Sequence, residues 1–452
     1  MKTLGLYVQE QASLYDRIFL TGAIRTDQNS AFGSNFQQVY YPKASLSWLV
    51  SDESFFPQFS WLNEFRVRTA YGASGVQPGS TAALILYSAA SVNIPTRSST
   101  ATGGSDVPSL LANQPGNPDL RPEKSTELEA GFDMTMLRSR VRFEYTFFNK
   151  KTKDALINVA LSPSSAAADL NPLLNIGSTQ GWGHEFQTTA QIIDKQRFGW
   201  DVLVSGSHFS NKVVDLGIDP NTGAPRILRT ASGSSSGEVR QMAGYPINAQ
   251  WYRPYTYNDD NGDGVLQVGE VHVDPEFKFY GYRVPRDIFS VVNGFDLFGK
   301  VLRINAMFDY KGGNSLLDGA NNFQCNTGPF ACRDTQDPTA PLDRQAAAIA
   351  KTYGTTVDGT NYKTAFGYFR NNQFWKFREA SAVWQLPSVV TSRIRAEQGS
   401  TLVFGVRNIH TWSSWTGIDP EANYGLTQSE SQSEFQTTGA PTYFTLRLNL
   451  KF

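Results

Sequence analysis

The sequence predicts an all-β fold, a transmembrane antiparallel meander β-barrel that is only partly present, with long extracellular loops. Three observations predict it. Apolar and polar residues alternate in many separate runs. Charged residues make up only 18% and aromatic residues 13% of the chain, yet the mean hydropathy is −0.35. Short connections also alternate with long ones. A membrane barrel explains all three, because its outer face is apolar and its lumen is polar.

The alternation follows the period of two that a β-strand requires. Arg66 lies between Phe65 and Val67, and Glu144 lies between Phe143 and Tyr145. Many runs reach about 10 residues, the length that a tilted membrane strand needs. About 13 strands are expected, near residues 2–11, 17–27, 39–50, 64–75, 123–135, 140–151, 182–193, 200–211, 286–296, 300–311, 373–386, 400–409 and 442–452.

The connections favour a barrel over a β-sandwich. Short connections are expected near 12–15, 136–139, 194–199 and 296–300. Long ones are expected near 76–121, 155–180, 212–285, 312–371 and 409–440, and the link near 28–38 does not follow the alternation. Outer-membrane barrels have short periplasmic turns and long extracellular loops. One short helix is expected within the long loops, at about 341–353.

Composition excludes several classes of function. The net charge is −1 and no cluster of Lys or Arg stands out, which argues against a nucleic-acid partner. The four histidines lack zinc-ligand spacing, and no catalytic constellation is visible, so the chain is not expected to be an enzyme. No run approaches the ~18 apolar residues of a membrane helix. No signal peptide precedes the first strand, from which we expect a missing N-terminal part.

One segment has the ligand spacing of an EF-hand loop. Its flanks do not resemble helices, so it would be a bare calcium loop that stiffens an extracellular connection. The alternative is a tight turn built on Asn-Gly and Asp-Gly. The candidate Ca²⁺ ligands are Asp259, Asn261, Asp263, the carbonyl of Val265 and Glu270.

The only two cysteines, Cys325 and Cys332, lie in a Gly/Asn/Pro-rich stretch. A loop disulfide formed in an oxidising compartment fits this position, and two free thiols are the alternative.

The last strand ends the chain on an aromatic residue. Its apolar side chains point one way and its polar side chains the other, which resembles the signal that the barrel-assembly machinery recognises on bacterial outer-membrane proteins. Such a strand can be recognised by addition to an exposed sheet edge. An ordinary amphipathic strand is the alternative. The signal residues are Phe444, Leu446, Leu448, Leu450 and Phe452.

Four stretches, in order along the chain, resemble TonB-dependent receptors, most closely the SusC/RagA-type branch. The first matches the motif NP(D/N)L(K/R)PE, and the terminal strand is the fourth. They are Gly116-Asn-Pro-Asp-Leu-Arg-Pro-Glu at 116–123, Phe374-Trp-Lys-Phe-Arg-Glu-Ala at 374–380, Val406-Arg-Asn-Ile-His-Thr-Trp at 406–412 with Gly417-Ile-Asp-Pro-Glu at 417–421, and 443–452.

The resemblance implies a plugged barrel of about 22 strands in the outer membrane. It implies uptake of glycans or peptides, energised by TonB, with a SusD-like lipoprotein over the mouth. No plug domain or TonB box is found, so residues 1–452 are interpreted as the C-terminal part of the barrel, not competent for transport alone. The alternatives are a complete, smaller passive channel and an extracellular β-sandwich adhesin or carbohydrate-binding protein.

Strand parity favours the partial barrel over the complete channel. With the last strand running toward the periplasm, the first of 13 alternating strands runs the same way. Direct closure would then need a parallel pair, whereas single-chain bacterial barrels have even, antiparallel strand counts. We therefore expect an open, curved sheet with no pairing between 2–11 and 442–452.

Overall fold

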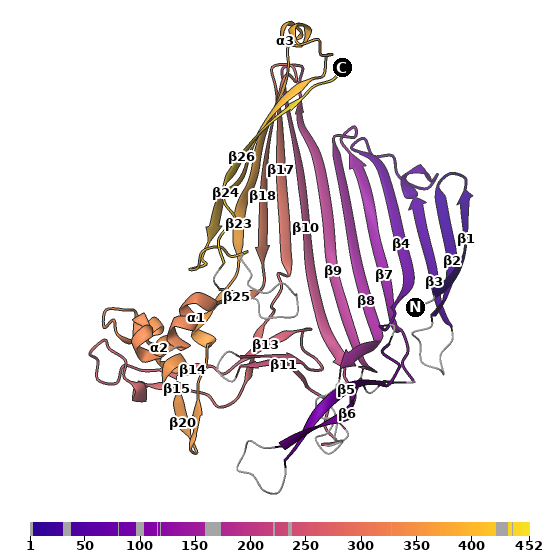
Figure 1. Cartoon of the computed structure of the whole chain (residues 1–452). Helices are drawn as coiled ribbons and strands as arrows, with labels where there is room; N and C mark the ends of the chain where they lie inside the picture. Colours follow the sequence, from indigo (N-terminus) through magenta and orange to yellow (C-terminus); the bar gives the residue numbers. More distant parts are fainter. Residues whose placement is uncertain are drawn as a thin grey trace.

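The computed structural model describes the chain from residue 3 to residue 452, except for residues 30–37, 80, 96–103, 115, 118, 159–172, 220–221, 234–236, 327, 422–432 and 436. Its main feature is one curved sheet of 13 strands in which every neighbouring pair is antiparallel (Figure 1). In sheet order the strands are β1 (Thr3–Leu14), β2 (Ile18–Asn29), β3 (Val39–Leu49), β4 (Leu62–Val76), β7 (Glu123–Met136), β8 (Val141–Asn158), β9 (Leu173–Asp194), β10 (Phe198–Asp215), β17 (Asp287–Leu297), β18 (Leu302–Gly312), β23 (Phe374–Gln385), β24 (Thr401–Ser413) and β26 (Tyr443–Asn449).

Each expected strand corresponds to one strand of this sheet, which confirms the meander. The expected bounds of several strands were too short at the end that carries the long loops, including β10 and β24, and most of all β8 and β9. β8 continues to Asn158 and β9 already begins at Leu173. The pairing of these strands shifts register between Thr152 and Ala155, where Asp154 has a positive φ of 54°. Such a bulge interrupts the alternation on which the sequence prediction depended.

The sheet has two free edges among the described residues. β1 pairs only with β2, and β26 pairs only with β24. The ring that a complete small channel would need is therefore absent from the described part of the chain. The β-sandwich alternative was wrong, because the long strands form one sheet rather than two packed sheets.

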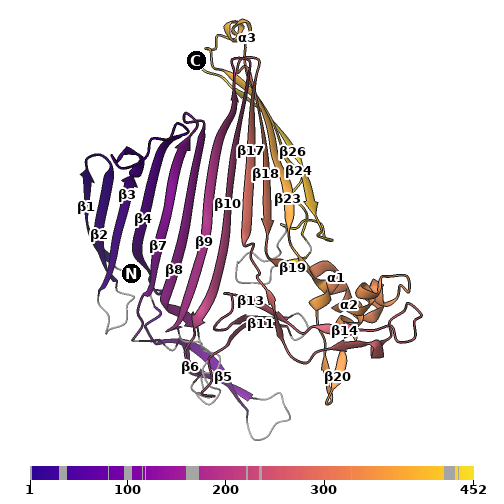
Figure 2. The ribbon, with the colours of Figure 1, turned by 180° about the vertical axis from the view of Figure 1, so that it is seen from behind.

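The two ends of the sheet differ, as Figures 1 and 2 show. Short turns, the C-terminus and α3 (Ser388–Arg393) lie at one end, and the long connections lie at the other. The long connections carry more structure than the sequence predicted. They contain β5 (Leu86–Pro95), β6 (Gly104–Gln114), β11 (Leu228–Gly233), β12 (Gly237–Gln241), β13 (Ala249–Tyr252), β14 (Tyr255–Tyr257), β15 (Val271–Val273), β16 (Lys278–Gly281), β19 (Ser315–Asp318), β20 (Thr355–Val357), β21 (Thr360–Tyr362), β22 (Phe369–Asn371), β25 (Ser433–Glu434), α1 (Gly319–Asn326) and α2 (Leu342–Thr352).

Short 3-10 turns complete the elements: η1 (Val50–Asp52), η3 (Val268–Glu270), η4 (Pro329–Ala331), η5 (Arg333–Thr335) and η6 (Phe366–Tyr368). The observed α2 confirms the single helix expected in the loops. Within the described residues, no helix is both long and apolar enough to cross a membrane.

The helices and small sheets of the long loops pack into a module with its own apolar core. The alanines of α2 are buried, and one side of the helix contacts Tyr252 and Phe369, whose ring centroids are 4.0 Å apart. The other side packs on Val271 and Val273 of β15. The loops at this end are therefore anchored by burial of apolar side chains and not by strand pairing alone.

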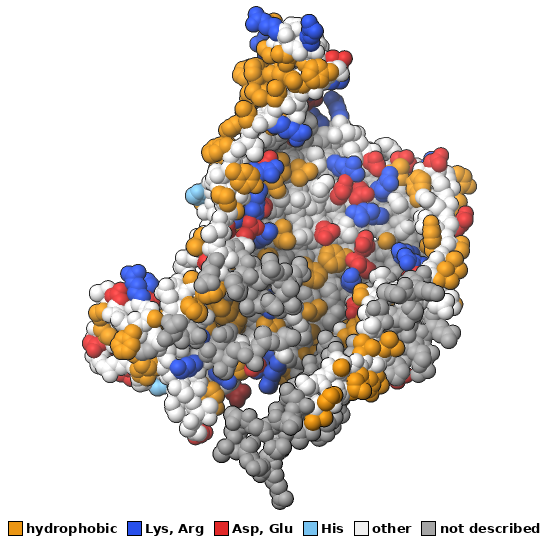
Figure 3. All heavy atoms as spheres, viewed as in Figure 1, with side chains coloured by type: hydrophobic (Ala, Val, Ile, Leu, Met, Phe, Trp, Pro, Cys, Tyr) orange, Lys and Arg blue, Asp and Glu red, His pale blue; other side chains and the backbone are white. Residues whose placement is uncertain are grey.

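Residues that pair across antiparallel strands lie on the same face of the sheet. One face carries Val67, Phe132, Tyr145 and Phe186, which follow one another from β4 to β9. The opposite face is polar. Figure 3 shows Lys, Arg, Asp and Glu side chains mixed over this hollowed face, with hydrophobic side chains along the rims. This division separates the lipid-facing surface from the lumen wall.

Candidate functional site

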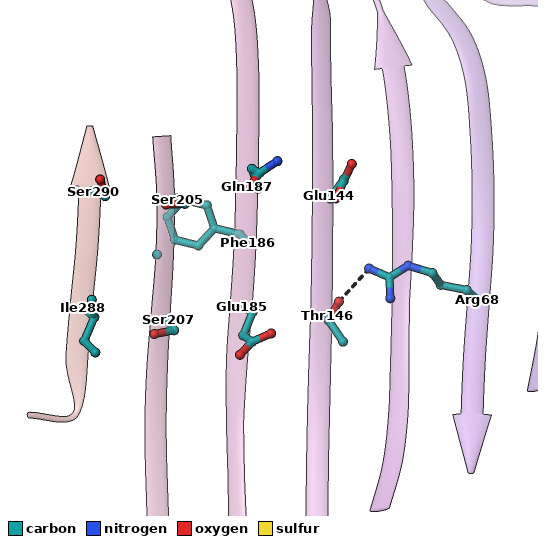
Figure 4. Close-up of a pocket in the computed structure, with 11 residues that line it drawn as sticks. Arg68, Glu144, Thr146, Glu185, Phe186, Gln187, Ser205, Ser207, Ile288 and Ser290 are labelled. Carbon is teal, nitrogen blue, oxygen red and sulfur yellow. Dashed lines mark hydrogen bonds between the residues drawn. The ribbon is translucent and has the colours of Figure 1, made fainter. Parts of the chain in front are cut away.

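The lumen wall is the candidate site, and its centre is a hollow of about 430 Å³ across β4 to β17. Its side chains form two rows, which Figure 4 shows. The first row is Glu144, Gln187, Ser205 and Ser290, and the second is Arg68, Thr146, Glu185, Ser207 and Ile288. Nearly all of these groups can donate or accept hydrogen bonds, so the wall is suited to polar solutes.

Arg68 crosses a whole strand to join the two sides of this hollow. It lies opposite Gly131 of β7, which in turn lies opposite Thr146 of β8. The guanidinium extends past Gly131 and donates to Thr146 Oγ1 at 2.7 Å. The same guanidinium donates to Asp133 Oδ1 at 3.1 Å. Arg68 is thus held in place with its charge balanced by Asp133.

A second arginine, on β18, also reaches across a neighbouring strand. Arg303 of β18 donates to both carboxylate oxygens of Asp201 on β10 at 2.9 Å, and to Asp296 at 3.2 Å. The path crosses Gly294 of β17, where a Cβ atom would lie 2.2 Å from Arg303 Nη2. A bidentate arginine–carboxylate pair fixes the geometry of both groups. The lumen wall is therefore charged but locally balanced.

A third ion-pair cluster fastens the segment after β24 onto the wall. Glu421 accepts hydrogen bonds from Lys311 at 2.8 Å, from Lys376 at 2.8 Å and from Arg378 at 2.7 and 3.0 Å. Lys376 also donates to Asp419 at 2.8 Å. We call Asp419, Glu421, Lys311, Lys376 and Arg378 the loop clamp. It joins two of the stretches that carried the family resemblance, 374–380 and 417–421.

The loop clamp is largely withdrawn from water. The side chain of Lys376 is 5% exposed and that of Glu421 is 22% exposed. Burial alone would raise the pKa of Glu421, but hydrogen bonds from Arg378, Lys311 and Lys376 outweigh it and hold the pKa well below its usual range. Glu421 is consequently ionised at neutral pH, and the segment is held by charge-assisted hydrogen bonds.

The stretch at 116–123, which leads into β7, is also held by hydrogen bonds to a neighbouring strand. Pro118 lies outside the described residues. Asn117 donates to the carbonyl of Leu173 at 3.0 Å, and Leu120 is fully buried. The side chain of Asn175 accepts from the Arg121 backbone N–H and donates to its carbonyl, both at 2.8 Å. The motif therefore ties the loop before β7 to the start of β9.

The proposed calcium ligands lie together in one exposed loop between β14 and β15. The Asp259 carboxylate accepts N–H bonds from Gly262, Asp263 and Gly264 at 2.9 to 3.2 Å. Buried Glu270 accepts from the backbone of Asp260 and Gln267. Asn261 and Val265 are exposed.

These contacts leave the calcium hypothesis open. The carboxylates are used by backbone donors, and across the described part of the chain no three His, Cys, Asp or Glu side chains form a group that could hold a metal ion. Calcium binding by this loop stays a prediction.

Cys325 and Cys332 form a disulfide in the loop module. Both cysteines are buried in the core next to α2, and the hydroxyl of Tyr368 lies 2.9 Å from Cys325 Sγ. Formation of this bond in cells stays a prediction.

The candidate assembly residues Phe444, Leu446, Leu448, Leu450 and Phe452 are all exposed at the free edge of the sheet. Phe444 stacks on Phe404 of β24 at a centroid distance of 6.3 Å, on the lipid-facing side. Their recognition by the assembly machinery stays a prediction.

A family model described as "TonB dependent receptor-like, beta-barrel" matches residues 1–409. The chain belongs to this family. It is an outer-membrane protein and not an enzyme. TonB-dependent receptor P26 of Formosa agariphila is 25% identical over 466 aligned positions, which cover 97% of this chain and 45% of that protein. TonB-dependent receptor SusC of Bacteroides thetaiotaomicron is 24% identical over 434 positions, which cover 92% of this chain and 41% of that protein.

A solved structure of the RagAB peptide transporter superposes with a TM-score of 0.78 at 18% identity, covering 100% of this chain and 47% of that chain. At this identity the likeness shows the fold alone. The chain of this TonB-dependent receptor homologue spans less than half the length of the relatives it matches.

Sequence reasoning missed the lumen-wall bridges and the loop clamp. Arg303 and Asp201 are 102 residues apart, and Lys376 and Glu421 are 45 apart. The one available signal was that one family-like stretch, 374–380, carries Lys376 and Arg378, whereas 417–421 carries two acidic residues. That complementarity predicts a contact between them, which the structure contains.

Proposed function

We propose that this chain forms one side of the substrate path of a TonB-energised outer-membrane importer for glycans or peptides too large for porins. The observation that carries the proposal is the wall at Arg68, Glu185 and Ser205, which is polar, concave and internally ion-paired, directly behind an apolar lipid-facing surface. Hydroxyl and amide groups of such solutes match its donors and acceptors. In the whole protein, TonB and a SusD-like lipoprotein would be the partners.

We also propose that the 13 strands are part of a larger closed barrel. Unpaired backbone groups in the hydrocarbon core cost several kcal/mol each, so strands outside this sheet would pair with the free edges of β1 and β26. This supports a partial barrel over the small passive channel.

Two adjacent residues provide a matched test of the substrate path. Ser205 lies on the lumen wall, whereas Val204 points to the lipid side between Thr188 and Val291. We expect Ser205→Trp in the full-length protein to reduce uptake of a labelled oligosaccharide or peptide at least severalfold, and Val204→Trp to leave it unchanged. Equal effects of the two variants would contradict the assignment of the wall.

Energy dependence separates the importer from the passive channel. Deletion of TonB, or a protonophore, is expected to abolish uptake by the importer, whereas a passive channel would continue to admit its solute.

Hydrogen exchange of the native outer-membrane protein tests whether the edges of the sheet are paired. Slow exchange of the β1 amides that point away from β2 supports further strands. Rapid exchange there, or a β1–β26 cross-link, would contradict the partial barrel.

A further inference from the structure

Four lysines lie close together on the lipid-facing side, near the end of the sheet that carries the long loops. In the strand register Lys151 of β8 lies opposite Gln180 of β9, which lies opposite Lys212 of β10. Lys153 lies opposite Lys124 of β7, one step further out. Paired residues share a face. The four side chains therefore form one patch, the lysine ledge.

The ledge is on the outer face and not in the lumen. Along β8 the residues Tyr145, Phe147, Lys151 and Lys153 have the same parity, with no register shift in the pairing with β7. Thr146 has the opposite parity and lines the lumen hollow. The lysines thus continue the apolar surface toward the extracellular end.

Their height matches the headgroup region of the outer leaflet. The apolar run of β8 starts at Val141, ten residues before Lys151. At about 3.3 Å per residue and a tilt near 40°, this corresponds to roughly 25 Å along the membrane normal, the height of the apolar band of such barrels. Trp182 lies one step below the ledge, with Lys212 Nζ 5.9 Å from its ring centroid. Tryptophan at this level is typical of the membrane interface.

The ledge also lacks the charge balance found in the lumen. Lumen arginines such as Arg68 and Arg303 have carboxylate partners. None of the four ledge lysines takes part in an ion pair within the described residues, although Lys124, Lys151 and Lys153 are exposed. Four unpaired positive charges at the boundary of the hydrocarbon core would attract anionic headgroups.

We propose that Lys124, Lys151, Lys153 and Lys212 bind the phosphate groups of phosphorylated lipids in the outer leaflet. Each ammonium acts as a point charge with three N–H donors, which suits phosphate oxygens of varied position. Bound lipid would fix the barrel at this face and set its depth in the membrane. This surface is separate from the lumen wall, so lipid binding does not depend on what the importer carries.

The test uses the full-length protein purified from outer membranes and stripped of lipid. Native mass spectrometry would measure binding of monophosphorylated lipid A and of the same lipid without its phosphate. The test variant replaces all four lysines with Gln. Lys150→Gln is the matched control, because Lys150 is adjacent in sequence but lies on the lumen side opposite Glu127.

We expect wild type and Lys150→Gln to bind the phosphorylated lipid more tightly than the dephosphorylated one. At about fivefold per lysine near a membrane surface, the quadruple variant should lose roughly several hundredfold in affinity, and high salt should weaken wild-type binding. If the quadruple variant does not assemble, Lys151→Gln/Lys212→Gln should lose about 25-fold in affinity. Undiminished lipid binding by the variants, equal binding of both lipids, or an acidic protein on the ledge in place of lipid would overturn the proposal.

Discussion

Substitution of Glu421 by Gln would release the segment after β24 from the lumen wall. The carboxylate receives N–H groups from Lys311, Lys376 and Arg378 at 2.7 to 3.0 Å. Loss of one partner of a buried ion pair costs roughly 3–5 kcal/mol, and loss of an exposed one costs about 0.2–1 kcal/mol. Glu421 is 22% exposed, and Gln retains one acceptor. We therefore expect a loss of about 2 kcal/mol, or roughly thirtyfold in the local opening equilibrium.

Hydrogen exchange of residues 414–421 measures this opening directly, because local unfolding determines exchange there. Glu379→Gln is the control, since its partner Arg407 is 54% exposed at the side chain and we expect a change below about 1 kcal/mol. Protection of 414–421 in Glu421→Gln equal to that in wild type or in the control would refute the reasoning.

The pH dependence provides an independent measurement of the same contact. The folded-state pKa of Glu421 is lowered by its three cationic partners. The clamp is therefore fully stabilising above the ordinary glutamate pKa of about 4.3, and this contribution is lost as the pH falls below that value toward the folded-state pKa. Protection of 414–421, measured relative to the intrinsic exchange rate at each pH, should fall below about pH 4 in wild type more than in Glu421→Gln.

Three further predictions concern features identified from the sequence. Calorimetric titration of the full-length protein should show Ca²⁺ binding that Asp263→Ala weakens by tenfold or more, because one acidic ligand is lost; absence of heat at millimolar Ca²⁺ would reject it. Mass spectrometry of protein from outer membranes, alkylated without reduction, should recover a Cys325–Cys332 cross-linked peptide, and two alkylated thiols would contradict it. Phe452→Ser should lower the amount of folded, heat-modifiable protein in outer membranes severalfold if the terminal strand is an assembly signal. Phe444→Tyr, which keeps an aromatic ring, is its control, and equal levels of both would count against the signal.

The strand pattern was determined by the sequence alone, because period-two alternation is a local property that each strand carries by itself. All 13 strands of the main sheet were located in this way, and the alternation also separated Arg66 and Arg68 from the lipid-facing side. The parity of the strands predicted free edges at β1 and β26. The prediction failed at the ends of β8 and β9, where a bulge near Asp154 breaks the period.

The tertiary structure alone decided which distant groups meet. Gly294 leaves room for Arg303 to reach across a strand, and Arg68 reaches Thr146 across β7, but nothing local in the sequence marks either crossing. Apart from α2, the loop module was not predicted, because its core combines short segments whose apolar residues lack a long period. Glu421 contacts Lys376 because the segment after β24 folds back over β23. Alternation determines which face of the sheet each side chain points to. The residue that it contacts depends on the register between strands and on the path of the connecting segments, which are properties of the whole sheet.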